Sequence, residues 1–269
     1  MQSKEIKIGK RNATFQHLVV IKINRYKRNT FNEMFVEGVR NINLAIKHGW
    51  KVKNWIYEDF NMLSGWAKEK VTQVKTECNY SLSRELITEL SGKTDVSELM
   101  AIMEIKQQKV EPSKNPFIVV FDRPSKKGNL GTILRSADAF GCDGVVVTGH
   151  GVDIYDPEVI VSSMGSYFAT TVQKMETNEE VTTWLAGLKQ KYKNLQIVAT
   201  TEKGEDNIRA VDFKKPTVLL VGNEAQGLSQ FYLNLATLNV KIPMQGEASS
   251  FNVACATSIF MYEIYTQRH

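Results

Sequence analysis

The chain has 269 residues, of which 42% are hydrophobic and 23% charged, and its formal net charge is +5. These values are typical of a soluble globular protein that folds as one large domain or two ordinary ones. No stretch reaches the roughly 18 apolar residues that span a bilayer, and the start is charged rather than apolar, so we expect no signal peptide. Three widely spaced cysteines match neither a disulfide framework nor a zinc site, and the four histidines lack metal-ligand spacing. We therefore expect a cytoplasmic protein with no membrane partner and no metal.

The positive charge is concentrated in the first part of the chain. Residues 1–114 contain 20 Lys and Arg against 13 Asp and Glu, whereas residues 115–269 contain 14 against 16. The density is highest from Lys4 to Arg28, where eight basic residues accompany one acid, Glu5. Such a segment favours a polyanionic partner, although a merely solvated surface is the alternative.

Short, mixed elements are predicted before residue 110. The spacing of Phe35, Val36, Val39, Ile42 and Ala45 predicts a helix over Asn32–His48, which Gly49 ends. A strand is expected over Val52–Tyr57, a helix from Ser64 to about Thr76, and another that Ser81 or Ser83 caps and that runs through Leu90. A small α/β sandwich, with the basic arm leading into it, fits this half best.

Two prolines, Pro112 and Pro116, mark a domain boundary near residues 110–116. Beyond it, apolar strands alternate with helical patterns, which predicts a parallel sheet covered on both faces. The expected strands are Phe117–Phe121, Gly144–Val147, Leu195–Ala199, Val218–Val221 and Leu238–Ile242. The expected helices are Leu130–Phe140, Pro157–Tyr167, Glu179–Tyr192 and Asn252–Tyr265, with Gly141 placed to end the first of them.

Three polar loops follow three of these strands. They span residues 122–131, 222–227 and 242–252, and they are rich in Gly, Asn, Ser and Glu. Ligands of open parallel sheets bind outside the carboxyl ends of the strands, so the three loops are expected to form a site. The first lacks the glycine spacing of dinucleotide folds, which argues against a nicotinamide-linked oxidoreductase.

Each loop also has an ordinary structural reading. Asn129 can be a simple helix cap with Arg135 a surface cation, and Glu224 can belong to a plain turn or else bind a ligand or orient Arg135. The third loop, with Ser249, Ser250 and Asn252 at the start of the last helix, holds more polar groups than one cap requires.

Three segments in this order, Gly128-Asn129-Leu130-Gly131 with Arg135, Gly222-x-Glu224-x-x-Gly227, and Ile242-Pro243-Met244 with Ser250-Phe251-Asn252-Val253, resemble the signature motifs of the SpoU (TrmH-type) RNA ribose methyltransferases of the SPOUT superfamily. The resemblance covers roughly residues 116–268. Residues 35–40 resemble, less specifically, the substrate-binding domain of that family, which has a fold like ribosomal protein L30e.

The resemblance implies an α/β protein with two domains. Residues 1–112 would be a basic L30e-like domain that binds RNA, and residues 113–269 a parallel-sheet SPOUT domain with a trefoil knot. The implied reaction transfers a methyl group from S-adenosylmethionine to a ribose 2′-hydroxyl in RNA, by a homodimer. It implies catalytic roles for Asn129, Arg135, Glu224, Ser250 and Asn252, and cofactor contacts from Thr200, Gly222, Ile242, Met244 and Phe251.

The chain departs from the family pattern at three places. Ser125-Lys126-Lys127 stands where an Asn-Pro pair is usual, Phe251 replaces Leu, and Ala254 stands where Ser is common. None removes a proposed catalytic group, so we expect activity. Large-subunit ribosomal RNA is favoured over transfer RNA as the substrate, because a separate basic domain suits a large folded RNA. The alternatives are a transfer-RNA ribose methyltransferase and a non-catalytic RNA-binding protein of ribosome assembly.

Overall fold

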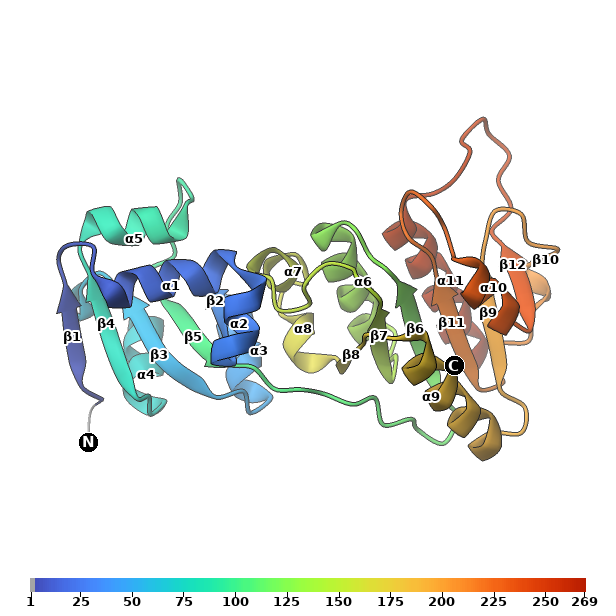
Figure 1. Ribbon diagram of the computed structural model, residues 1–269, viewed down its shortest axis with the longest axis horizontal. Helices are drawn as coiled ribbons and strands as arrows, with labels where there is room; N and C mark the ends of the chain where they lie inside the picture. The colour runs from blue at the N-terminus through green and yellow to red at the C-terminus, as the bar shows by residue number, and fades with distance from the viewer. Residues whose placement is uncertain (1–2) are drawn as a thin grey trace. The chain divides into compact units, whose positions relative to one another are not determined.

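The computed structural model describes residues 3–269, which form two compact units (Figure 1). The first contains the chain up to Lys106 together with residues 155–169, and the second contains residues 107–154 and 170–269. The chain therefore passes between the units three times. The change at 106/107 lies close to the expected boundary, but residues 155–169 belong to the first unit although they follow that boundary in sequence.

The first unit is built on a five-stranded mixed sheet with the order β1-β4-β3-β5-β2. Its strands are β1 (Glu5–Ile8), β2 (Glu33–Glu37), β3 (Val52–Tyr57), β4 (Cys78–Leu82) and β5 (Met100–Glu104). Its helices are α1 (Ala13–Ile23), α2 (Arg25–Phe31), α3 (Val39–Lys47), α4 (Gly65–Gln73), α5 (Arg84–Ser91), α7 (Pro157–Ser162) and α8 (Ser166–Ala169). Side chains of α1 and α5 pack on the sheet and form the core, among them Phe15, Leu18, Ile21, Leu86 and Leu90.

The prediction of one helix over Asn32–His48 is wrong in its first part. Residues Glu33–Glu37 form β2, which pairs antiparallel with β5 and is buried at all five positions. Gly38 then adopts a φ of 95° and begins α3. Apolar side chains in this stretch fit a helical period, but pairing with β5 and packing against α7 decide the conformation.

Two other helix predictions for this unit have instructive outcomes. Ser64 caps α4 as expected, since its hydroxyl accepts a hydrogen bond from the Ala67 N–H. The single helix expected over Pro157–Tyr167 is divided into α7 and α8, because Met164 and Gly165 both have positive φ. A side chain at Gly165 would meet Leu44 Cδ1 at 2.5 Å, so the turn there also allows close packing against α3.

The second unit is built on a seven-stranded sheet, entirely parallel, with the order β10-β12-β9-β11-β6-β7-β8. Its strands are β6 (Phe117–Asp122), β7 (Gly144–Thr148), β8 (Val172–Met175), β9 (Gln196–Thr200), β10 (Asp206–Asn207), β11 (Thr217–Val221) and β12 (Leu238–Lys241). Its helices are α6 (Lys127–Ala139), α9 (Asn178–Lys191), α10 (Gln230–Leu235) and α11 (Val253–Arg268). All five predicted strands are confirmed, whereas β8 and β10 were not predicted.

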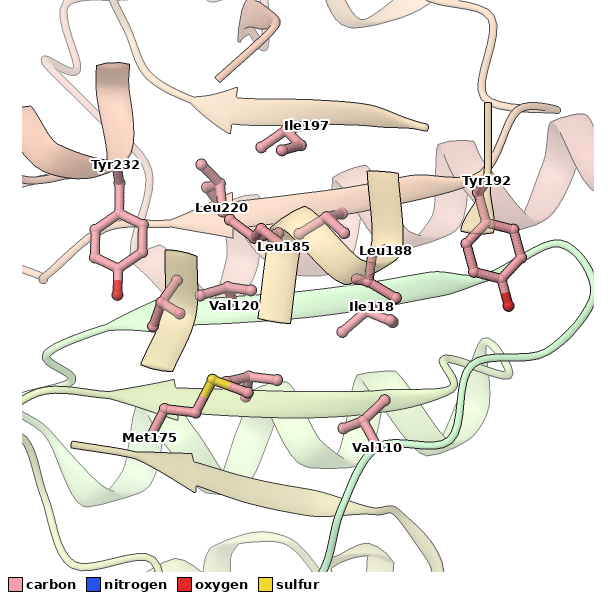
Figure 2. Packing of buried hydrophobic residues seen from close by; sticks show 13 residues of the cluster. Val110, Ile118, Val120, Met175, Leu185, Leu188, Tyr192, Ile197, Leu220 and Tyr232 are labelled. Atoms are coloured by element: carbon pink, nitrogen blue, oxygen red, sulfur yellow. The ribbon is translucent and has the colours of Figure 1, made fainter. Parts of the chain in front are cut away.

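Helices cover both faces of this sheet. On one face, α9 and α10 pack on alternate residues of the central strands, including Ile118, Val120, Ile197 and Leu220 (Figure 2). Helices α6 and α11 pack against each other, with the Ser136 and Ser258 hydroxyls 2.7 Å apart. The strands β6, β7 and β11 are buried throughout, which explains their continuous apolar sequences.

The parallel arrangement places the carboxyl ends of neighbouring strands at the same edge of the sheet. Strands β12, β9, β11 and β6 are adjacent, and three of the loops that follow them are the polar loops singled out in the sequence. The trefoil knot that the resemblance implies stays a prediction.

Candidate active site

A cavity of about 330 Å³ lies among the loops at this edge of the second unit. Its walls come from the ends of β9 and β12, the loop after β11, and the segment that enters α11. The predicted cofactor residues Thr200, Gly222, Ile242, Met244 and Phe251 all line it, as do the predicted catalytic residues Glu224 and Ser250. Residues of the second and third signature segments therefore share one cavity, which the first segment does not line.

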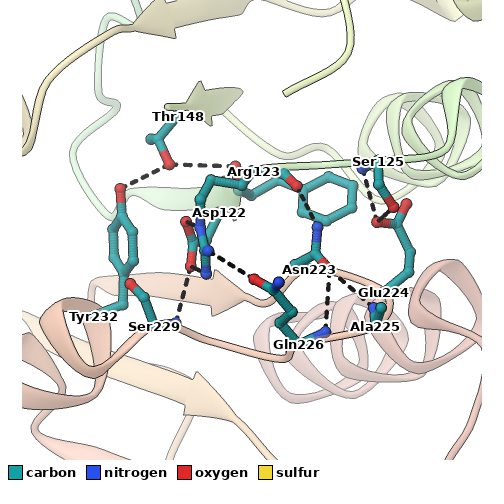
Figure 3. Close-up of polar contacts among 11 residues, drawn as sticks. Asp122, Arg123, Ser125, Thr148, Asn223, Glu224, Ala225, Gln226, Ser229 and Tyr232 are labelled. Atoms are coloured by element: carbon teal, nitrogen blue, oxygen red, sulfur yellow. Dashed lines mark hydrogen bonds and ion pairs between the residues drawn. The ribbon is translucent and has the colours of Figure 1, made fainter. Parts of the chain in front are cut away.

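Glu224 is the centre of the polar network beside the cavity. One carboxylate oxygen accepts hydrogen bonds from the Ser125 backbone N–H at 2.8 Å and from the Ser125 hydroxyl at 2.6 Å. The other accepts from the Lys126 N–H at 3.0 Å and from Asn129 Nδ2 at 3.1 Å. The loop after β11 is thereby bonded to the start of α6, which lies about a hundred residues earlier in sequence (Figure 3).

The same contacts set the charge of Glu224. Partial burial alone raises the pKa of its carboxyl, but the hydrogen bonds from Ser125 and Asn129 outweigh burial and hold the pKa below its usual value. The carboxylate is therefore ionised at neutral pH, and its contacts require that state because all four partners are donors.

Asn129 links this network to the third signature segment. Its amide nitrogen donates to Glu224, and its oxygen accepts a hydrogen bond of 3.2 Å from Asn252 Nδ2. Asn252 in turn caps α11, since its oxygen accepts from the N–H groups of Ala254 and Cys255 at 2.9 and 3.3 Å. One chain of contacts from Glu224 through Asn129 to Asn252 thus joins the three segments and fixes the orientation of the Asn129 amide.

Arg135 lies apart from this network. It is exposed on α6 and does not line the cavity, and among residues 3–269 its side chain has no hydrogen bond or ion pair. It lies six positions after Asn129, which is about 9 Å along the helix axis and a third of a turn around it. Glu224 therefore orients Asn129, and the expectation that it orients Arg135 is wrong within this chain.

A second network, which the sequence did not indicate, holds the loop after β11 from the other side (Figure 3). Asp122, 1% exposed, accepts two hydrogen bonds from the guanidinium of Arg123, at 2.8 and 2.9 Å. The same guanidinium donates to Gln226 Oε1 at 3.0 Å, and the Arg123 carbonyl accepts from Asn223 Nδ2 at 2.7 Å. The Ser229 N–H donates to Asp122 at 3.0 Å.

The backbone of Arg123 is unusual, since its φ is 47°. This left-handed conformation is unfavourable for a residue with a side chain, by roughly 1–2 kcal/mol. The contacts with Asn223, Gln226 and Asp122 hold the residue in this conformation. We call Asp122 and Arg123 the loop latch, because together they fix the cavity-lining loop over residues 222–229.

Several further residues line the cavity that the sequence did not single out. The apolar ones include Val240 of β12 and Ala256 and Phe260 of α11, and the polar ones include Thr201 and Glu202. Nothing in the spacing of the apolar residues separates a cavity wall from an ordinary core face, so they could not have been found without the fold.

The basic segment of the first unit is partly used in its own structure. Lys22 donates to the carbonyls of Leu90 and Ser91 at the end of α5, both at 2.6 Å, and Arg11 pairs with Glu89 at 2.7 Å. Arg28 is 1% exposed. Arg11, Lys22 and Arg28 thus have structural partners, whereas Lys4, Lys7 and Lys10 of the same segment are exposed.

The structure also bears on membrane-spanning helices and on metal sites. No helix within residues 3–269 is both long enough and apolar enough to cross a membrane. Within the same residues, no group of three or more His, Cys, Asp or Glu side chains is placed to hold a metal ion.

Comparisons with known proteins agree with this arrangement. The model of the SpoU rRNA Methylase family matches residues 116–262, and that of the SpoU L30e-like domain matches residues 12–101. A 23S rRNA (uridine(2479)-2′-O)-methyltransferase from Streptomyces viridochromogenes is 39% identical over 266 residues, which is 97% of this chain and 92% of that protein. A tRNA (guanosine(18)-2′-O)-methyltransferase from Aquifex aeolicus is 35% identical over 161 residues, 59% of this chain and 73% of that protein.

A solved structure resembles the whole chain. The SpoU methyltransferase AviRb from Streptomyces viridochromogenes, in complex with the cofactor AdoMet, superimposes with a TM-score of 0.91 at 38% identity and covers 96% of this chain and 98% of its own. The match includes both units, and the family models cover both halves of the sequence. The chain therefore belongs to the SpoU rRNA methylase family, with an L30e-like domain preceding its methylase domain.

Proposed function

We propose that the protein transfers the methyl group of S-adenosylmethionine to a ribose 2′-hydroxyl in large-subunit ribosomal RNA. The observation that carries this proposal is that hydrogen bonds from Glu224 through Asn129 to Asn252 join the three signature segments beside a cavity that the second and third of them line. Ribosomal RNA is favoured because the relative that matches nearly the full chain is named for 23S rRNA, whereas the tRNA relative matches only 59% of it.

The cavity fits S-adenosylmethionine in size and in chemistry. Its volume of about 330 Å³ lies within the range of roughly 300–1,000 Å³ that small-molecule sites occupy. Apolar side chains such as Ile242, Met244 and Phe251 provide a surface for the adenine ring, and Ser250 and backbone groups provide polar contacts. A side chain at Gly222 would lie 2.3 Å from the carbonyl carbon of Gly227, so glycine lets the loop fold back tightly at the cavity wall. When bound, the cofactor supplies an activated methyl group on its sulfonium.

In this proposal, the residues beside the cavity act by orienting the RNA, and not by deprotonating the ribose hydroxyl with a side chain of strongly shifted pKa. The Asn129 amide is fixed on both sides, by Glu224 and by Asn252, and can position the ribose. Arg135 lies outside the cavity, and its guanidinium is assigned an electrostatic role: it binds a phosphate of the RNA. Proximity and alignment of the hydroxyl account for most of the acceleration in this proposal.

A homodimer is part of the proposal. The exposed side of α11 presents Ile259, Tyr262 and Tyr265, which are 36%, 58% and 39% exposed. The Tyr262 and Tyr265 rings contact Phe140 just after α6, so the apolar surface extends over two packed helices. Such a patch favours a second copy of the chain as its partner. Light scattering on Tyr262→Glu checks this: the variant should be monomeric, and an unchanged mass would contradict the interface.

Mapping of ribose methylation in RNA from cells with and without the protein tests the substrate. One 2′-O-methyl group in large-subunit ribosomal RNA should disappear in its absence, whereas a loss confined to transfer RNA would contradict the ribosomal assignment. In vitro, Arg135→Ala should abolish methylation while it retains S-adenosylmethionine binding by calorimetry. Failure of the unaltered protein to bind the cofactor would overturn the enzymatic assignment.

A further inference from the structure

The junction between α1 and α2 in the first unit is a rigid elbow. Asn24 ends one helix and begins the next: its backbone N–H donates to Val20, and its side chain accepts from the Lys27 N–H at 3.1 Å. Only this one extended residue separates the two helices, so the direction of the chain changes abruptly.

A buried guanidinium fixes the angle of the elbow. Arg28 of α2 is 1% exposed and donates to the last carbonyls of α1, Ile21 at 3.0 Å and Lys22 at 2.8 Å. It also pairs with Asp156 at 3.3 Å, at the start of α7 in the same unit. Because a buried cation forfeits its hydration, these contacts make the elbow a well-defined structure rather than a mobile turn.

The outer side of the elbow carries large apolar side chains in water. Ile23 is 70% exposed, Tyr26 73% and Phe31 44%. These three lie within nine residues of sequence, in a protein whose other large apolar residues are mostly buried. Phe31 is held by His17, with ring centroids 4.7 Å apart, and by Lys27, 5.8 Å from its ring. Within residues 3–269, no ring contact and no side-chain hydrogen bond involves Tyr26.

Positive charge surrounds these side chains. Arg25 and Lys27 flank Tyr26 in sequence, and no acidic residue occurs between Glu5 and Glu33. RNA matches both features, because its unpaired bases stack on aromatic rings and its phosphates attract cations. Aromatic side chains stack on unpaired bases while neighbouring cations neutralise the backbone.

We infer that the α1–α2 elbow, defined by Ile23, Tyr26, Lys27 and Phe31, is a stacking surface for unpaired bases of the RNA substrate. The inference rests on the proposed function for the identity of the ligand as RNA. It assigns recognition of unpaired nucleotides to this elbow, with Tyr26 as the stacking side chain and Lys27 as a phosphate contact.

The test measures binding of two labelled probes by fluorescence anisotropy: a 12-nucleotide oligouridylate and a 12-base-pair RNA duplex. Tyr26→Ala should weaken binding of the oligouridylate at least about fivefold, the effect of losing one stacked base, and should change duplex binding less than twofold. Lys27→Ala should weaken both probes and reduce the dependence of binding on salt. Met62→Ala is the matched control, since Met62 is 78% exposed in the same unit and should change neither.

Tyr26 is exposed, so its replacement should leave folding and S-adenosylmethionine binding unchanged, and both are measured in parallel. Equal binding of the oligouridylate by Tyr26→Ala and the unaltered protein would overturn the inference. A change in oligomeric mass with unchanged RNA binding would overturn it as well, in favour of a contact between copies. Either result would leave the methyltransferase assignment intact, since that assignment depends on cofactor binding and methyl transfer.

Discussion

The replacement Glu224→Gln tests the network that joins the signature segments. The carboxylate accepts from four donors, two at each oxygen, and an amide has only one oxygen to offer. Whichever way the amide turns, the N–H of Ser125 or of Lys126 loses its acceptor and faces an NH₂ group. Hydrogen bonds to a charged group contribute about 1.5–3 kcal/mol each. Because Glu224 is only half-buried and water can replace part of the loss, we expect the free energy of unfolding to fall by about 2 kcal/mol.

Differential scanning calorimetry should then show a melting temperature lower by about 4–8 °C, since 1 kcal/mol corresponds to roughly 2–4 °C in a chain of this size. The methylation rate should fall at least about tenfold, because a lost contact at Ser125 or Lys126 loosens the network that orients the Asn129 amide. Glu179→Gln is the matched control: Glu179 is an exposed glutamate of the same unit that does not line the cavity, and its replacement should be silent. If Glu224→Gln melts within 1 °C of the unaltered protein and methylates at the same rate, the proposed network carries neither stability nor function.

Three further predictions follow from the contacts of single residues. Arg123→Ala and Arg123→Gly should both weaken S-adenosylmethionine binding, because each releases the loop latch. The glycine variant should be about 1 kcal/mol more stable than the alanine variant in urea unfolding, because glycine adopts a φ of 47° without strain. Equal stabilities of the two variants would refute the backbone argument. The pKa of Glu224 is lowered on folding, so the free energy that its carboxylate contributes to stability is present above the ordinary glutamate pKa of about 4.3 and is lost as the pH falls through the lower folded pKa. In acid unfolding curves, the difference in unfolding free energy between the unaltered protein and Glu224→Gln should therefore close. A difference that widened with falling pH would contradict this reasoning. Burial raises the pKa of the Cys142 thiol to about 12, so mass spectrometry at pH 8 should find iodoacetamide on the exposed Cys255 first, and faster labelling of Cys142 would count against its burial.

The strands of the second unit were predictable because burial on both faces gives a continuous apolar sequence. Strand β8 escaped prediction since it lies at the edge of the sheet and contains Gln173 and Lys174. In the first unit, the sequence predicts a helix where β2 forms, because the apolar residues fit both the helical and the strand period. Only the pairing with β5 distinguishes the two conformations. Local sequence carries no information about such pairing.

The sequence also indicated which residues belong to the candidate site, but not which residues they contact. The sequence indicated the three polar loops, and in the structure Asn129 is hydrogen-bonded to Glu224 and Asn252 while Glu224 and Ser250 line the cavity; the catalytic roles of these residues stay a prediction. The contact of Glu224 with Ser125 spans 99 residues of sequence, and no local rule relates them. The latch of Asp122 and Arg123 escaped for the same reason, since its role depends on a positive φ that sequence does not reveal.

The threefold passage of the chain between its two units has a practical consequence. Helices α7 and α8, encoded after the start of the methylase domain, complete the core of the first unit: Trp50 donates to the Phe168 carbonyl at 3.3 Å, and its ring contacts those of Tyr167 and Phe168. A fragment that ends at residue 110 would expose the buried Trp50 ring to water and leave the buried Arg28 guanidinium without Asp156. The first unit therefore cannot be excised, or exchanged between relatives, as a continuous N-terminal segment. A functional chimera has to transplant residues 155–169 along with it.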